Sequence, residues 1–228
     1  LGSVTVICSD KTGTLTRNEM TVREVYTGEQ LYEVTGAGYR PQGEFIPVSP
    51  SPSDQRQDLQ KVLTIAARCN NARIAPDESG DNWTVIGDPT EGALVVMSLK
   101  GGVDVPDGSR KVVFEIPFDS ERKAKSVIER MDDGRTVLFH KGAPEVVLDK
   151  CKEELCNGEI RPLTAERRQA IMQQGSRMAS VALRVLGFAF RDQPDGSDGE
   201  FPERDLVFAG LAGMMDPPRD EVRESVAE

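Results

Sequence analysis

The stretch VTVICSDKTGTLT, residues 4–16, begins with five apolar or β-branched residues and then passes into an acidic segment rich in threonine and glycine. This pattern predicts a short buried strand that delivers Asp10 to a loop. Active-site residues of open α/β sheets collect at such strand ends. The same residue types are ordinary turn formers, so a solvated loop is the alternative interpretation. The stretch thus favours an α/β fold and makes Asp10 a candidate functional acid.

Strand and helix patterns alternate along the rest of the chain. Glycine-containing turns at 26–29 and 132–134 join successive strands as in hairpins. Polar segments at 36–58 and 76–82 are predicted to be exposed connections, the first of them mobile. Apolar spacing and caps predict helices at 59–67, 89–100, 144–148 and 164–182, and strands at 20–25, 30–34, 112–116, 124–131, 136–141, 184–190 and 206–215.

Composition limits the classes of function. The 228 residues carry 28 basic and 38 acidic side chains, a formal net charge of -10 that disfavours nucleic acid as a partner. No apolar run approaches the roughly 18 residues of a membrane helix, and the first residues lack the features of an export signal. Four cysteines, Cys8, Cys69, Cys151 and Cys156, and the single histidine lack the spacing of a zinc site, so we expect reduced thiols and no structural metal.

The segment from Asp10 suits phosphoryl transfer. A carboxylate can attack the γ-phosphate of ATP to give an aspartyl phosphate. Lys11, the Thr12 hydroxyl and neighbouring backbone amides would then position and neutralise the phosphoryl oxygens. Asp10, Lys11 and Thr12 are therefore the candidate catalytic residues.

A second group of residues suits nucleotide binding. Phe118 offers an aromatic face for a purine, with core packing as the alternative. Lys123 and Lys141, on neighbouring predicted strands, can bring two ammonium groups towards a polyphosphate, although solvated surface lysines are the more common case. Gly142 removes a side chain and so allows a ligand to approach the backbone. Together these residues predict a nucleotide pocket on the 112–141 strands.

Five motifs occur in one order along the chain, and with them the sequence resembles the P-type cation-transporting ATPases, within the haloacid-dehalogenase-like phosphotransferases. The matching segments are DKTGTLT (10–16), GDPTEGAL (87–94), FDSERK (118–123), KGAPE (141–145) and DPPR (216–219).

The resemblance implies an α/β fold with a mainly antiparallel sheet flanked by helices, inserted into an incomplete dehalogenase-like phosphorylation domain. Residues 1–17 would be the N-terminal piece of that phosphorylation domain, 18–215 the nucleotide-binding domain, and 216–228 a hinge and the start of the second piece. The chain would then be a soluble, monomeric cytosolic fragment of an integral membrane pump of the calcium or sodium/potassium branch. Its partners would be ATP, Mg²⁺ and the remaining membrane, actuator and phosphorylation domains, without direct membrane contact.

The resemblance also implies roles for individual residues. Glu91 would hydrogen-bond the adenine amino group, although its place three residues after Asp88 also suits a capping box. Thr90 would lie at the pocket edge, and Arg184 would reach the phosphates, with a salt-bridged strand-start arginine as the alternative. Asp10 and Thr12 would provide an incomplete magnesium site. The hinge residues would be Asp216 and Arg219.

The sequence departs from the family pattern at several points. Ser120 stands where calcium-pump-like members often have a basic residue, and the charge moves to Arg122. The TGEQ sequence at 27–30 only superficially matches the dephosphorylation loop, and the magnesium motif GDGxND has no counterpart. We therefore expect a fragment that presents ATP to Asp10 only within the full-length pump, and that alone binds nucleotide weakly without turnover. The alternatives are a dehalogenase-like phosphatase or phosphotransferase and a non-catalytic adenylate-binding module.

Overall fold

The computed structural model describes residues 14–49, 56–77, 82–105, 110–192, 202–217, 219 and 222. The strand predicted at 4–8 and the candidate catalytic residues Asp10, Lys11 and Thr12 lie outside this part of the chain. The same holds for the predicted cap of the first helix at residues 53–54.

Ten strands form one large sheet, in the order β3-β2-β1-β12-β11-β8-β7-β6, with β9 beside β12 and β10 beside β9. All pairs in it are antiparallel except β9 with β12, which confirms the predicted mainly antiparallel α/β fold. The strands are β1 (Thr21–Thr27), β2 (Gln30–Val34), β3 (Phe45–Pro47), β6 (Lys111–Asp119), β7 (Ala124–Arg130), β8 (Thr136–Gly142), β9 (Cys151–Cys156), β10 (Glu159–Pro162), β11 (Arg184–Asp192) and β12 (Leu206–Met215). A separate hairpin contains β4 (Arg73–Pro76) and β5 (Trp83–Ile86).

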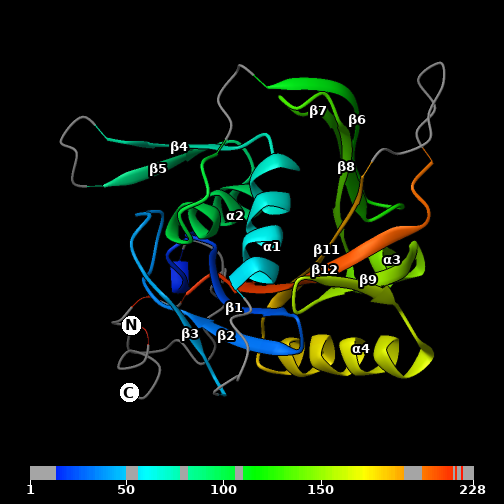
Figure 1. Cartoon of the computed structure of the whole chain (residues 1–228). Helices are drawn as coiled ribbons and strands as arrows, with labels where there is room; N and C mark the ends of the chain where they lie inside the picture. The colour runs from blue at the N-terminus through cyan, green and yellow to red at the C-terminus, as the bar shows by residue number, and fades with distance from the viewer. Residues whose placement is uncertain are drawn as a thin grey trace, which may run out of the picture.

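Helices cover both faces of the sheet (Figure 1). The helices α1 (Arg56–Arg68) and α2 (Pro89–Lys100) pack on one face, and α3 (Pro144–Asp149) and α4 (Ala165–Ser180) on the other. The alternation of β12 shows why: Val207 and Ala209 join the core under α1, while Leu206 and Phe208 join the core under α3 and α4. A strand buried on both faces reads as a continuous apolar run, as residues 206–215 do. No helix within the described ranges is long and apolar enough to cross a bilayer.

Five of the observed strands, β3, β4, β5, β9 and β10, were not predicted. The segment 36–58, expected to be a connection throughout, contains β3 and the first three residues of α1. β3 has only three residues, all of them at least partly exposed, so it lacks a periodic signal. At the loop expected at 76–82, Pro76 is the last residue of β4 and pairs with Trp83 of β5, and β9 with β10 form a further hairpin. That last hairpin turns at Asn157-Gly158, both with positive φ, a recognised turn signal that the sequence analysis overlooked.

The two ends of the sheet domain leave it side by side. Thr21 on β1 pairs with Met215 on β12, where both strands reach the edge of the domain. Beyond them, the Arg17 amide donates to the Pro217 carbonyl and the Arg219 amide to the Leu15 carbonyl, both at 3.0 Å. The Asp216 carboxylate also accepts hydrogen bonds from the Thr16 hydroxyl and the Glu19 amide. The predicted hinge therefore consists of two paired chain segments and not a single linker.

Candidate nucleotide pocket

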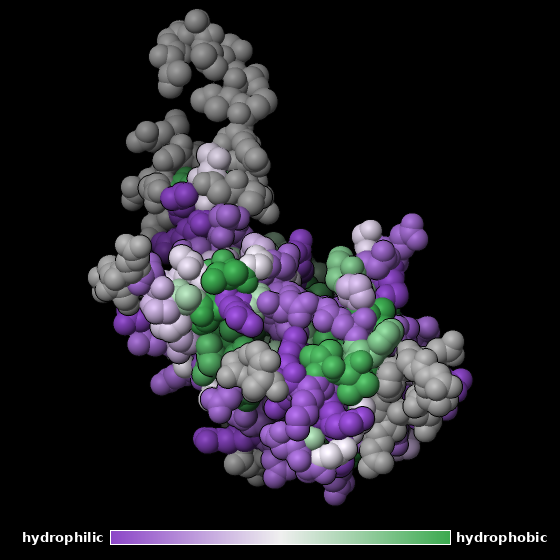
Figure 2. All heavy atoms as spheres, turned by 90° about the horizontal axis from the view of Figure 1, so that it is seen from above, coloured by the Kyte–Doolittle hydropathy of each residue, from purple (hydrophilic) through white to green (hydrophobic). Residues whose placement is uncertain are grey.

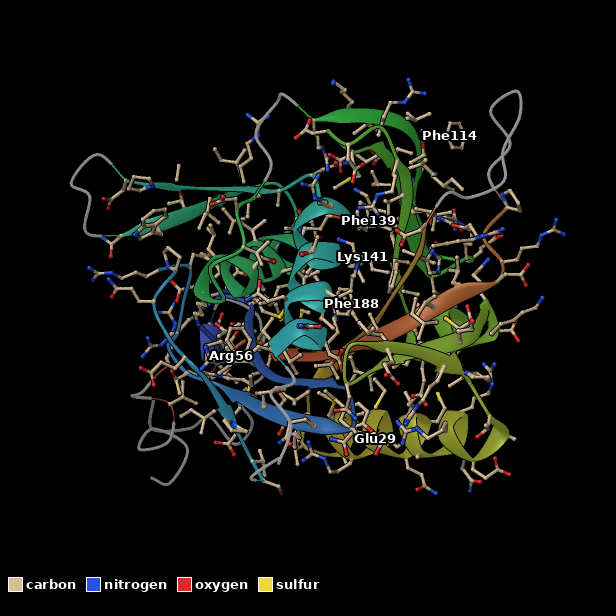
Figure 3. The ribbon with its side chains drawn as sticks, viewed as in Figure 1. Glu29, Arg56, Phe114, Phe139, Lys141 and Phe188 are labelled. Atoms are coloured by element: carbon tan, nitrogen blue, oxygen red, sulfur yellow. The ribbon has the colours of Figure 1, made fainter. Side chains whose placement is uncertain are left out.

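A pocket of about 610 Å³ opens where α2, the β6–β7 turn, β7, β8 and the start of β11 meet. Six of the seven residues predicted to bind nucleotide line it, although they come from distant parts of the chain. Lys141 lies beside α1 in Figure 3, close to the core residues Phe139 and Phe188. The pocket is therefore on the same face of the sheet as α1 and α2. The lining residues are Asp88, Thr90, Glu91, Phe118, Lys123, Lys125, Lys141, Ala143, Arg184, Val185 and Leu186.

Phe118 is 64% exposed, so ordinary core packing does not account for it. It lies in an irregular part of the β6–β7 ladder, where register pairing passes directly from Ile116 to Asp119. A bulge of this kind redirects a side chain. On the face that Figure 2 shows, hydrophobic side chains form separate groups among hydrophilic ones. Because the Phe118 ring is exposed at the pocket mouth, it is available to stack on a flat ligand.

The pocket contains two buried lysines. Lys125 and Lys141 are register partners on β7 and β8, with side chains only 5% and 8% exposed. Glu91 Oε1 lies 2.8 Å from Lys141 Nζ and 3.2 Å from Lys125 Nζ, and Glu115 Oε1 lies 3.2 Å from Lys125 Nζ. Two carboxylates thus balance two ammonium groups, as buried charges require.

Lys125 was missed by the sequence analysis, although a signal was present. The predicted turn at 132–134 is centred on Asp133, and that register places Lys125 directly opposite Lys141. Cross-strand neighbours on one face of a sheet contact each other, so the prediction that Lys141 binds nucleotide also pointed to Lys125 as a residue of the same pocket.

Glu91 does not complete a capping box. Asp88 caps α2, since its carboxylate accepts a hydrogen bond of 3.0 Å from the Glu91 amide. The Glu91 carboxylate instead accepts from Lys141 Nζ and, through Oε2, from the Asn71 amide at 2.9 Å. Burial alone would raise the pKa of Glu91, but the charge and hydrogen bond of Lys141 outweigh it and lower that pKa. Glu91 is therefore an ionised acceptor inside the pocket.

Arg184 and Thr90 face each other across the pocket, with Arg184 Nη1 donating to the Thr90 hydroxyl at 3.1 Å. Arg184 has no carboxylate partner among the described residues, which does not match the alternative of a salt-bridged arginine. Arg122, by contrast, points away from the pocket towards Glu203. It does not replace the basic residue whose place Ser120 takes.

Gly142 has a packing role in addition to any role in ligand approach. A Cβ at this position would lie 2.6 Å from the Lys123 carbonyl oxygen and 2.8 Å from Ala124 Cβ. The missing side chain lets β8 approach the start of β7 closely. Gly142 itself is not among the residues that line the pocket.

Comparisons with known proteins show the family to which this chain belongs. The family model described as P-type ATPase, cytoplasmic domain N, matches residues 58–221. This chain belongs to that family. A calcium-transporting ATPase of Bacillus subtilis is 37% identical over the whole chain, which covers 26% of that protein. The cation-transporting ATPase pma1 of Synechocystis and the human calcium-transporting ATPase type 2C member 1 are each 39% identical over 99% of the chain, which covers 26% and 24% of them. The chain thus spans about a quarter of the length of these relatives.

In this N domain the structure gathers the predicted nucleotide residues but not every predicted site residue. Asp216 and Arg219 lie at the paired segments where the chain leaves the sheet, and neither lines the pocket. Within the described ranges no group of three His, Cys, Asp or Glu side chains could hold a metal ion. Cys69, Cys151 and Cys156 are buried free thiols.

Proposed function

We propose that this chain is the ATP-binding domain of a cation-transporting P-type ATPase and presents ATP to Asp10 in the full-length pump. The observation that carries the proposal is Phe118, an exposed aromatic ring at the mouth of a pocket that contains ionised Glu91 and the Lys125–Lys141 pair. The adenine stacks on Phe118, and its amino group donates to Glu91.

The distribution of charge in the pocket supports a position for the phosphates in its outer part. Lys125 and Lys141 are balanced by Glu91 and Glu115, so the inner pocket carries little net positive charge. Lys123 and Arg184 have no carboxylate partner in the part of the chain that the structure describes. We infer that these two side chains hold the phosphates, and that Lys141 mainly orients Glu91 and contacts the ribose side of the nucleotide. Thr90 fixes Arg184 through its hydroxyl.

Chemistry requires the rest of the pump. Asp10 is the proposed phosphoryl acceptor, with Lys11 and Thr12 beside it, and Mg²⁺ would neutralise the phosphoryl oxygens there with Asp10 and Thr12 as ligands. These residues lie outside the described ranges. The membrane, actuator and phosphorylation domains are the proposed partners. The similar proteins from Bacillus subtilis and human are calcium-transporting ATPases, which favours calcium as the transported cation.

The test is an ATP and ADP titration of the isolated chain. We expect a dissociation constant on the order of 0.1 to 3 mM, because an open pocket gains one stacked ring and a few screened charges. Magnesium should change this value little if adenine contacts dominate. Micromolar affinity that requires magnesium, or phosphatase turnover, would instead support a complete dehalogenase-like enzyme. Binding without any phosphorylation of Asp10 in the full-length protein would support a regulatory adenylate module.

A further inference from the structure

A second polar cluster lies on the opposite face of the β7–β8 pair. Lys125 and Lys141 face the pocket, so their chain neighbours Ser126 and His140, which are also register partners, face the other way. Glu203, in the segment that leads into β12, lies against them and its side chain is only 10% exposed. The carboxylate accepts hydrogen bonds from the Ser126 hydroxyl at 2.5 Å and from Lys150 Nζ at 3.1 Å. None of these residues lines the pocket.

Serine hydrogen bonding fixes the state of the histidine. The Ser126 hydroxyl has one hydrogen and donates it to Glu203, so it accepts from His140 Nδ1, which lies 2.7 Å away. His140 Nε2 is buried and has no hydrogen-bond partner among the described residues. Burial lowers the pKa of His140 despite the nearby Glu203 carboxylate, so a neutral ring fits this site. Ser126 and His140 themselves are fully buried.

Arg122 connects this cluster to the pocket. Its Nη1 donates to both Glu203 oxygens, at 2.6 and 2.8 Å. Its Nη2 donates to the carbonyls of Ala124 at 2.6 Å and Pro117 at 3.0 Å. One guanidinium therefore joins the two strand ends that flank the β6–β7 turn, next to Phe118 on one side and Lys123 on the other.

The β6–β7 turn has few other supports. Phe118 has no register partner in the β6–β7 ladder, and Lys123 has a φ of 52°, which is strained for a residue with a side chain. The turn is held by the Asp119 carboxylate, which accepts from the amides of Glu121 and Arg122, and by a bond from the Lys123 amide to the Asp119 carbonyl. The Ala143 amide also donates to the Lys123 carbonyl at 3.0 Å, which ties the Lys123 end to β8. Arg122 adds a side-chain link from both ends of the turn to Glu203.

We propose that Glu203 is a positioning residue of the nucleotide pocket: from the far face of the sheet it holds Arg122, and through Arg122 it places Phe118 and Lys123. The inference rests on the proposed nucleotide binding of this pocket. Because a carboxylate that only balances buried charge would affect stability alone, the two roles can be separated experimentally.

The experiment compares Glu203→Gln with Glu154→Gln in the whole chain. Glu154 is a matched control, because it is also buried and also paired with arginines, Arg161 and Arg167, but away from the pocket. We expect Glu203→Gln to weaken ATP binding about three- to tenfold, and Glu154→Gln to lower the melting temperature without weakening ATP binding. Arg122→Lys, which keeps the charge but loses the planar fork, should weaken binding as Glu203→Gln does.

A double-mutant cycle with Phe118→Ala tests the route of the effect. If Glu203 acts through the position of Phe118, Glu203→Gln should cost less than about twofold in the Phe118→Ala background. Equal losses in both backgrounds, or equal losses from Glu203→Gln and Glu154→Gln, would overturn the proposal. Amide chemical shifts of residues 118–123 without nucleotide give a separate readout, expected to move in Glu203→Gln and not in Glu154→Gln. Wild-type chain that binds no ATP would refute the proposed function, while these shifts would still test the link from Glu203 to the turn.

Discussion

Phe118→Ala is the substitution that tests the pocket most directly. About two thirds of the Phe118 side chain is open to solvent, so its truncation removes little packing and should change the free energy of unfolding by less than about 0.5 kcal/mol. A purine that stacks on one face of the ring would cover about 60 Å² of apolar surface, worth about 1.5 kcal/mol. This value lies in the range of about 1 to 3 kcal/mol for base stacking on aromatic side chains. We therefore expect ATP affinity to fall about 5- to 30-fold.

The assay is an NMR titration with ATP, which measures millimolar affinities and reports the residues involved. Phe114→Ala is the matched control, since Phe114 is on the same strand, is 38% exposed and does not line the pocket. Figure 3 shows Phe114 well apart from Lys141. Equal affinity in wild type and Phe118→Ala, or equal losses from the two phenylalanine variants, would refute the stacking assignment.

Three further predictions concern charged groups. Lys141→Ala should weaken ATP binding about three- to tenfold in calorimetry, because Lys141 orients Glu91. The chain should stay folded, because Lys125 remains 3.2 Å from Glu91 and still neutralises it. An unchanged affinity would contradict this prediction. Asp10→Asn should leave ATP affinity unchanged. Wild-type chain incubated with γ-labelled ATP and magnesium should retain no acid-stable label. Label that appears in wild type and is lost in Asp10→Asn would show that the chain is catalytically complete. Burial alone would raise the pKa of Glu203, but hydrogen bonds from neighbouring donors, including Ser126 and Arg122, outweigh it and hold that pKa well below its ordinary 4.5. The contribution of Glu203 to stability is therefore present above pH 4.5 and is lost as pH falls below it. The difference in unfolding free energy between wild type and Glu203→Gln should accordingly shrink in urea denaturation below pH 4.5, and a constant difference would contradict the assignment.

Local sequence patterns predicted the regular core elements well, for identifiable physical reasons. Asp88 followed by a proline predicted the start of α2, and the structure shows both the cap and the first-turn proline. The turn at 132–134 predicted the pairing of β7 with β8, on which the position of Lys141 depends. In each case residues close in sequence determine the geometry, so the signal is local.

Contacts between distant segments left no such signal. Asp58 is fully buried because it accepts hydrogen bonds from the amides of Asn157 and Gly158 in the β9–β10 turn, about a hundred residues away. The partnership of Arg122 with Glu203 is of the same kind, since the two residues are 81 positions apart. Side-chain periodicity shows which face a residue occupies, but it does not identify the partner that a distant loop brings to that face.

The location of the pocket in the sheet is consistent with a domain that delivers its ligand as a rigid body. β8 pairs with β11, β11 with β12, and β12 runs as a buried ten-residue strand to the paired segments at Asp216. A movement at these segments would therefore carry the pocket through an unbroken hydrogen-bonded ladder. The balanced charges in the inner pocket suit the same purpose, because a domain that held ATP tightly by its phosphates would resist passing them to Asp10. In the proposed function, recognition through Phe118 and Glu91 would fix the adenine end and leave the phosphate end available for transfer.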